Sequence, residues 1–139
     1  MGARRQARSR ALQALYQLDV AQGSARDALA SAWAAEPEEG PRDPEAAAFA
    51  ETLVHGVVEH LRDIDALVEQ HSLHWRMDRM ARIDRNILRL AIFELKYVPD
   101  IPKSVTLNEA VELGKLFGTE SSSAFLNGLL DKIATSVAK

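Results

Sequence analysis

The chain has 139 residues, a formal net charge of −3 and no cysteine. A length of this order is typical of one compact domain. The absence of cysteine excludes thiolate zinc sites, iron–sulfur clusters, cysteine nucleophiles and redox pairs, and it fits a reducing compartment. Hydrophobic residues make up 47% and charged residues 27%, as in ordinary globular proteins. No apolar run reaches the length of about 18 residues that a membrane span requires, so we expect a globular protein.

The charges are distributed unevenly along the chain. The charged residues before the first acidic residue, Asp19, are all arginines, whereas the stretch from Asp27 to Glu59 is mainly acidic. The net negative charge argues against non-specific wrapping of nucleic acid. A basic N-terminal segment on an acidic body can still contact an anion locally. The arginines of this segment are Arg4, Arg5, Arg8 and Arg10.

Apolar residues recur at intervals of three and four, which predicts helices throughout and an all-α fold. The first helix is expected over residues 4–22, ending at Gly23, because glycine is the preferred residue where a helix turns into the left-handed region. A second helix is expected over residues 24–35, with Ser24 as its N-cap. Three of the five prolines fall within residues 36–45, and this stretch is predicted to be a linker between an N-terminal and a C-terminal helical half.

The third helix is expected to begin at Asp43 or Pro44 and to carry one apolar stripe as far as Val68. Residues 83–98 are apolar on most sides, which predicts a central helix that buries Leu90. A capping box formed by Thr106 and Glu109 would begin the next helix, which Gly118 would end. The last helix is expected to start within residues 121–123.

Motifs for catalysis and for metal binding are weak. His71 and His74 lie three residues apart, but a zinc site needs three or four converging ligands, so we expect no metal. The seven glycines form no phosphate-binding loop, and Ser121 to Ser123 form no nucleophile elbow. Glu94 projects with the apolar stripe of the central helix. It is either a perturbed acid or, as we favour, an acceptor for backbone N–H groups at the start of a neighbouring helix. Three residues of low helix propensity, Asn108, Asn127 and Gly128, lie inside apolar helical patterns. We expect them to allow close packing of helices.

The N-terminal segment carries the strongest functional signal. At 100° per residue, Arg5, Ser9, Leu12 and Tyr16 share one stripe of the first helix, with Arg8 beside them. Arginine binds phosphate in a bidentate manner and stacks on bases, and a tyrosine ring offers a further stacking surface, so this flank suits single-stranded RNA. A solvated basic face or an Arg-rich transit peptide would have the same composition.

Four blocks stand out in the chain: residues 4–16 (RRQARSRALQALY), residues 83–95 (IDRNILRLAIFEL), Ile101-Pro102 with residues 108–118 (NEAVELGKLFG), and residues 125–131 (FLNGLLD). In this order and at this spacing, the four blocks together resemble the NusB transcription antitermination factors of bacteria. The stretch from about Gly23 to Asp63 matches weakly, and no function is transferred to it.

The resemblance implies about seven helices in two small bundles, forming one NusB-like domain over residues 1–139. It also implies a cytoplasmic protein with neither catalytic activity nor a cofactor. NusB proteins bind the ribosomal protein NusE, and the pair binds boxA, a short single-stranded element in nascent ribosomal RNA, so that RNA polymerase reads through terminators. Alternatives are an RNA cytosine methyltransferase that would need a second polypeptide, and a protein-interaction module such as a homodimer.

Matching positions imply the following site residues. Arg4, Arg5 and Arg8 would bind RNA phosphates, and Tyr16 would lie near the boundary between RNA and NusE. Ser121 and Phe125 match positions of RNA contact, although Phe125 could equally be a core residue. Asp78 and Asp84 match acidic positions that face NusE, a basic protein, and their structural alternative is a solvated acidic flank. Two positions depart from the pattern, because Gln6 replaces a third consecutive arginine and Ala124 replaces a cation.

Overall fold

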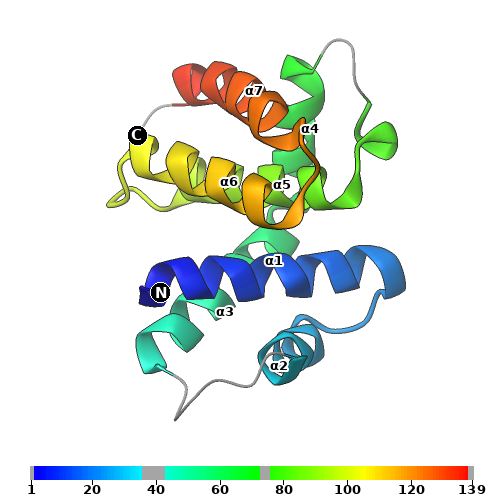
Figure 1. The fold of residues 1–139 in the computed structure, drawn as a ribbon, viewed down its shortest axis with the longest axis vertical. Helices are drawn as coiled ribbons and strands as arrows, with labels where there is room; N and C mark the ends of the chain where they lie inside the picture. Colours follow the sequence, from blue (N-terminus) through cyan, green and yellow to red (C-terminus); the bar gives the residue numbers. More distant parts are fainter. Residues whose placement is uncertain (1, 36–42, 73–75, 138–139) are drawn as a thin grey trace. The chain divides into compact units, whose positions relative to one another are not determined.

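The computed structural model describes residues 2–35, 43–72 and 76–137, and over these residues the chain forms seven α-helices, one 3-10 helix and no strand (Figure 1). The prediction of an all-α fold is confirmed. The elements are α1 (Ala3–Ala21), α2 (Ala25–Ala35), α3 (Pro44–Glu59), α4 (Leu61–His71), the 3-10 helix η1 (Met77–Arg79), α5 (Arg82–Tyr97), α6 (Lys103–Phe117) and α7 (Ser122–Ser136).

The ends of α1 and α2 follow the predicted signals. Gly23, just after α1, has a φ of +112°, a conformation that residues with a Cβ rarely adopt. Ser24 caps α2, because its Oγ accepts the backbone N–H of Asp27 at 3.1 Å. Asp43 caps α3 in a similar way, since its Oδ1 accepts the backbone N–H of Glu45 at 2.9 Å.

The predicted third helix is two helices, because the chain leaves the helical conformation at His60. This residue has φ −106° and ψ 20°, and it lies between the last residue of α3 and the first residue of α4. Its imidazole stacks on the ring of Tyr97 from α5, with the ring centroids 4.0 Å apart. In the sequence, the apolar positions keep their spacing of three and four residues through His60, so the hydrophobic period did not reveal the break.

The chain divides into two compact units, residues 1–59 and residues 60–139. In the first unit, α1, α2 and α3 pack against one another. The boundary therefore lies between Glu59 and His60 and not at residues 36–45, because α3 belongs to the core of the first unit. Residues 36–42 of the predicted linker lie outside the described residues.

In the second unit α5 is central, since α4, α6 and α7 all pack against it. Leu90 is 2% exposed, which confirms its predicted core position. The guanidinium of Arg89 also ties α5 to α4, donating from Nε and Nη2 to the two carboxylate oxygens of Asp65 at 2.9 and 3.0 Å. A bidentate pair fixes geometry as well as adding attraction.

Glu94, on the same helix, is 2% exposed, and its Oε1 accepts the hydroxyl of Thr106 at 3.1 Å. Glu94 accepts a hydrogen bond near the start of α6, as predicted. The donor in this bond is the side-chain hydroxyl of Thr106, whereas the prediction was a backbone N–H group. The predicted capping box is wrong, because α6 begins at Lys103, three residues before Thr106.

Close packing of α6 on α7 depends on two glycines. A Cβ at Gly114 would lie 2.9 Å from Cδ1 of Leu126, and one at Gly118 would lie 2.4 Å from Oγ of Ser122. The prediction of close packing at Asn108, Asn127 and Gly128 is wrong, since all three are exposed. At the other end of α6, Lys103 Nζ donates to the carbonyl oxygens of Ala134 and Val137, which helps to close the second unit.

Candidate nucleic-acid interface

The arginines at the start of α1 contact side chains of α3. The guanidinium carbon of Arg4 lies 4.7 Å from the centroid of the Phe49 ring, and that of Arg8 lies 5.5 Å from the same centroid. Both distances fall within the range of attractive cation–π contacts. Arg4 Nε is also 3.9 Å from Oε1 of Glu45, and both side chains of this pair remain well exposed. Arg4 is therefore partly ordered by α3 and still open to a ligand.

The rest of the predicted basic flank is only partly open. Arg5 and Tyr16 are exposed, and the exposed fraction of Tyr16 is 40%. Ser9 and Leu12, which share their stripe, are buried, and Arg8 is only 4% exposed. The placement of Arg8 thus differs from the open flank that the helical spacing predicted, and its guanidinium lies over the Phe49 ring of α3.

Arg10 is a buried residue that packs between α1 and α2. It is 4% exposed, and its guanidinium carbon lies 5.4 Å from the centroid of the Trp33 ring on α2. A buried arginine stacked on a buried aromatic residue holds α2 against α1. The four arginines of the N-terminal segment therefore have different environments, and exposure distinguishes Arg4 and Arg5 from the other two.

The second unit contains a pocket of about 340 Å³ next to the start of α7. It brings together three predicted site residues, Asp84 from the first turn of α5, Ser121 and Phe125. Phe125 is half-buried and lines the pocket, so it is not a fully enclosed core residue. Asp84 Oδ1 is buried and finds no hydrogen-bond donor among the described residues. The remaining lining residues are Arg79, Met80, Ala81 and Thr119.

Hydroxyl groups fix the start of α7 beside this pocket. The backbone N–H of Thr119 donates to Oγ of Ser122 at 2.9 Å, and Thr119 Oγ1 lies 3.2 Å from Oγ of Ser121. Ser123 Oγ donates to the carbonyl oxygen of Val111 on α6 at 3.2 Å. Each of these bonds limits how far the predicted contact residues Ser121 and Phe125 can move.

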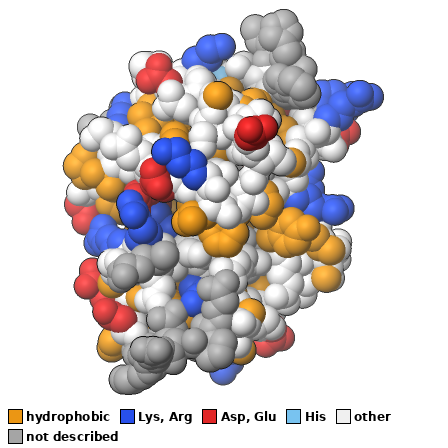
Figure 2. Space-filling view, in the orientation of Figure 1, with side chains coloured by type: hydrophobic (Ala, Val, Ile, Leu, Met, Phe, Trp, Pro, Cys, Tyr) orange, Lys and Arg blue, Asp and Glu red, His pale blue; other side chains and the backbone are white. Residues whose placement is uncertain are grey.

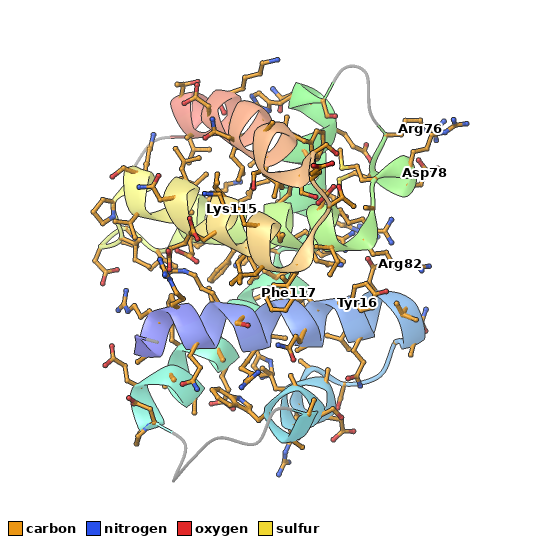
Figure 3. The ribbon with its side chains drawn as sticks, viewed as in Figure 1. Tyr16, Arg76, Asp78, Arg82, Lys115 and Phe117 are labelled. Atoms are coloured by element: carbon orange, nitrogen blue, oxygen red, sulfur yellow. The ribbon has the colours of Figure 1, made fainter. Side chains whose placement is uncertain are left out.

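Asp78 lies elsewhere in the second unit. It is exposed on η1 beside Arg76, whose Nε is 3.5 Å from its Oδ1, and Figure 3 shows the two side chains next to each other. Together with Glu69, Ser72 and Met77 they line a second pocket of about 380 Å³. The two acidic residues predicted to face a basic partner, Asp78 and Asp84, therefore line different pockets.

The surface of the second unit carries charges of both signs. Figure 2 shows lysine or arginine side chains beside acidic ones on the face in view, with hydrophobic side chains between them. Exposed apolar side chains on α6 include Val105 and Leu116, which are 41% and 60% exposed. Such a mixed surface suits contacts with a protein as well as with a polyanion.

The structure adds residues that the sequence did not single out. Arg79 and Thr119 line the pocket with Phe125, and Phe49 contacts Arg4. Neither Arg79 nor Thr119 belongs to a sequence pattern that predicts a binding site, and only the tertiary fold brings them to the same pocket. Hydrophobic periodicity places Phe49 on the apolar stripe of the predicted third helix, but it indicates burial only and not the cation that contacts the ring.

Metal binding and membrane insertion have no support within the described part of the chain. No three His, Cys, Asp or Glu side chains come together there as ligands, and His74 lies outside it. Among the helices that the structure describes, none combines the length and the apolar character that a membrane crossing demands.

Comparisons with known proteins identify relatives over nearly the whole length. The model of the NusB family matches residues 5–135. The transcription antitermination protein NusB of Myxococcus xanthus is 62% identical over 139 residues, covering 100% of this chain and 99% of the relative. That of Anaeromyxobacter dehalogenans is 53% identical over 132 residues, covering 95% of this chain and 90% of the relative.

Solved structures agree with the sequence comparisons. NusB of T. maritima superimposes with a TM-score of 0.88 at 35% identity, covering 98% of this chain and 93% of that one. A structure described as the antitermination factors NusB and NusE in complex with dsRNA gives a TM-score of 0.85 at 26% identity, covering 96% and 97%. The chain belongs to the NusB family.

Proposed function

We propose that this protein is a transcription antitermination factor that binds the boxA element of nascent ribosomal RNA together with NusE. The observation that carries the proposal is the exposed pair Arg4 and Arg5 at the start of α1, in a chain of a family with a solved NusB–NusE–RNA complex. The complex would help RNA polymerase to read through terminators inside ribosomal RNA operons.

The first unit supplies the phosphate contacts in this proposal. Arg4 and Arg5 are exposed and would bind RNA phosphates through their planar N–H groups. Arg8 belongs to the same set by its position in the family pattern, and its buried guanidinium would act next to Arg4. Tyr16 is exposed and would lie where RNA and NusE meet.

The second unit supplies the base contacts. The pocket of about 340 Å³ has room for an unstacked nucleobase, with Phe125 as an aromatic wall and Ser121 as a hydrogen-bonding group at its edge. The acidic side chains Asp78 and Asp84 would attract NusE, because complementary charge speeds and orients the docking of a basic protein.

The activity is binding, and no bond is made or broken. The relatives are transcription antitermination proteins, and the family model covers most of this chain. No cofactor enters the proposed activity. Because nascent ribosomal RNA and RNA polymerase are in the bacterial cytoplasm, we assign the protein to that compartment.

A binding experiment should compare single-stranded with double-stranded RNA. The solved NusB–NusE complex is described with dsRNA, whereas boxA is proposed to act as a single strand. Unstacked bases can enter a pocket, whereas the bases of an A-form helix cannot, since they are held in the stack and paired with the opposite strand. Binding to single-stranded boxA should therefore exceed binding to the same sequence in a duplex.

Arg5→Ala tests the proposed phosphate contact, with Arg26→Ala as its matched control. Both arginines are exposed and belong to the first unit, but Arg26 is on α2 and has no part in the proposal. Fluorescence anisotropy with labelled boxA RNA should show weaker binding for Arg5→Ala and a salt slope reduced by about 0.7, as for one lost phosphate contact. Equal affinities for the two variants would refute the assignment.

A further inference from the structure

The ring of Phe49 connects two arginines of α1 to α3. It is 8% exposed, and the guanidinium carbons of Arg4 and Arg8 lie 4.7 and 5.5 Å from its centroid. Residues four apart are neighbours on one face of a helix, so both arginines meet the ring from the same side of α1. Arg8 is buried there at 4% exposure, whereas the side chain of Arg4 is 44% exposed.

We propose that Phe49 is a positioning residue for RNA binding, which holds Arg4 ready to receive a phosphate. The inference rests on the proposed function, since it assigns to a core aromatic residue a part in the same phosphate site. Phe49 itself touches no RNA in this proposal and acts only through Arg4.

The chemistry of the guanidinium group makes this arrangement effective. The group is planar, its face is attracted to an aromatic ring, and its N–H bonds lie in the plane. Stacking therefore uses a surface that phosphate binding does not need, and the N–H edge of Arg4 stays available to an anion. Glu45 is 3.9 Å from Arg4 Nε and shows where a negatively charged oxygen can approach.

Holding Arg4 in place lowers the entropic cost of binding. A long side chain loses rotamer freedom when it is fixed on a phosphate, and a side chain that is already ordered loses less. An aliphatic residue at position 49 could fill the core between α1 and α3, but it would present no negative ring face to a cation. The inference therefore requires the ring itself and not merely an apolar group.

The experiment compares Phe49→Leu with Leu53→Val by fluorescence anisotropy of labelled boxA RNA in a salt series. Leu53 is one turn further along α3 and fully buried, so its truncation is a matched loss of core volume without loss of a ring. Phe49→Leu should weaken binding about three- to tenfold, the factor expected when one long side chain must be ordered on binding. Leu53→Val should leave the affinity of the folded protein unchanged.

The salt dependence distinguishes positioning from loss of charge. Phe49→Leu leaves every cation present, so its binding should be weaker at each salt concentration with the slope unaltered. Arg4→Gln removes a cation, and its slope should fall by about 0.7. A merely structural role for Phe49 would change binding only in proportion to the unfolded fraction, which circular dichroism measures on the same samples.

A second variant keeps the test decisive if Phe49→Leu does not fold. Pentafluorophenylalanine at position 49 keeps the shape and the apolar character of the ring but reverses the charge on its face, so it should also weaken RNA binding. The same replacement at Phe93, a buried ring of the second unit, is the control.

The outcomes separate the inference from the proposed function. If Arg4→Gln and Arg5→Ala both bind RNA as the unmodified protein does, the proposed phosphate site is wrong. If those variants bind weakly but pentafluorophenylalanine at position 49 has no effect, the phosphate site stands and the positioning role of Phe49 is overturned. Weaker binding with an unchanged salt slope supports the inference.

Discussion

Replacing Gly118 with alanine should destabilise the protein by about 2–4 kcal/mol. The added Cβ would lie 2.4 Å from Oγ and 2.6 Å from Cβ of Ser122, and 2.8 Å from the carbonyl oxygen of Gly114. Nonbonded carbon atoms prefer separations of about 3.5–4.0 Å, so the first turn of α7 must move. Gly118 has a φ of −94°, which alanine adopts freely, and the cost is therefore steric.

The magnitude has two sources. Forcing extra volume into a packed contact costs about 1–3 kcal/mol. Moving Ser122 also weakens the 2.9 Å hydrogen bond that its Oγ accepts from the backbone of Thr119, and such a bond contributes about 1 kcal/mol. Together these losses are a large part of a typical stability of about 5–15 kcal/mol.

Urea denaturation followed by circular dichroism measures this effect. The matched control is Gly128→Ala, because Gly128 is exposed on α7 and a Cβ there meets nothing within 4 Å, so this change should be neutral or slightly stabilising. Adding Ser122→Gly to Gly118→Ala should restore part of the lost stability, because it removes the two Ser122 atoms among the three that lie close to the new Cβ. A free energy of unfolding for Gly118→Ala within about 0.5 kcal/mol of that of the unmodified protein, the range of an ordinary surface change, would refute the steric explanation.

Three further predictions test the core and the basic segment. Leu90→Ala should lower the free energy of unfolding by about 2–5 kcal/mol through a cavity under α5, and an unchanged urea midpoint would contradict its central position. Thr106→Val should cost about 1–3 kcal/mol in the same assay, because it removes a donor from the buried carboxylate of Glu94; equal stability would show that the 3.1 Å bond contributes nothing. Glu45→Gln should strengthen boxA binding about two- to fivefold at low salt, since its carboxylate partly neutralises Arg4, and anisotropy that shows weaker binding would refute this competition.

Much of the helical architecture follows from hydrophobic periodicity, because the same residues that repeat every three or four positions are those that the fold buries. The stripe that contains Leu90 predicted a central helix, and α4, α6 and α7 do pack around α5. Local signals also predicted where helices start and end, as at Ser24 and Gly23. These features depend on neighbouring residues in the chain.

Features that depend on distant residues were not predictable in the same way. The chain leaves the helical conformation at His60, and the imidazole of this residue stacks on the ring of Tyr97 in another helix. Thr106 looked like a capping residue, but its hydroxyl donates to Glu94, which also comes from another helix. Gly118 was predicted only as a helix end, because the sequence does not show how closely α7 approaches it.

The candidate site shows the same division between local and tertiary information. The segment containing Arg4 and Arg5 was predicted from charge alone, and both side chains are exposed. The burial of Arg8 could not be predicted, since it depends on the tertiary fold, in which its guanidinium lies over a ring of α3. The pocket that joins Asp84 to Phe125 required α5 and the start of α7 to meet in space.

The most direct test of the central claim is a fluorescence anisotropy titration of a labelled boxA oligonucleotide and a scrambled control, with and without purified NusE, at two salt concentrations. The proposed function predicts selective binding of boxA that NusE strengthens, with affinity falling as salt rises because phosphates are neutralised. Equal, weak and steeply salt-dependent binding of both RNAs, unaffected by NusE, would contradict the proposed function. It would mean that the basic start of α1 binds RNA without specificity.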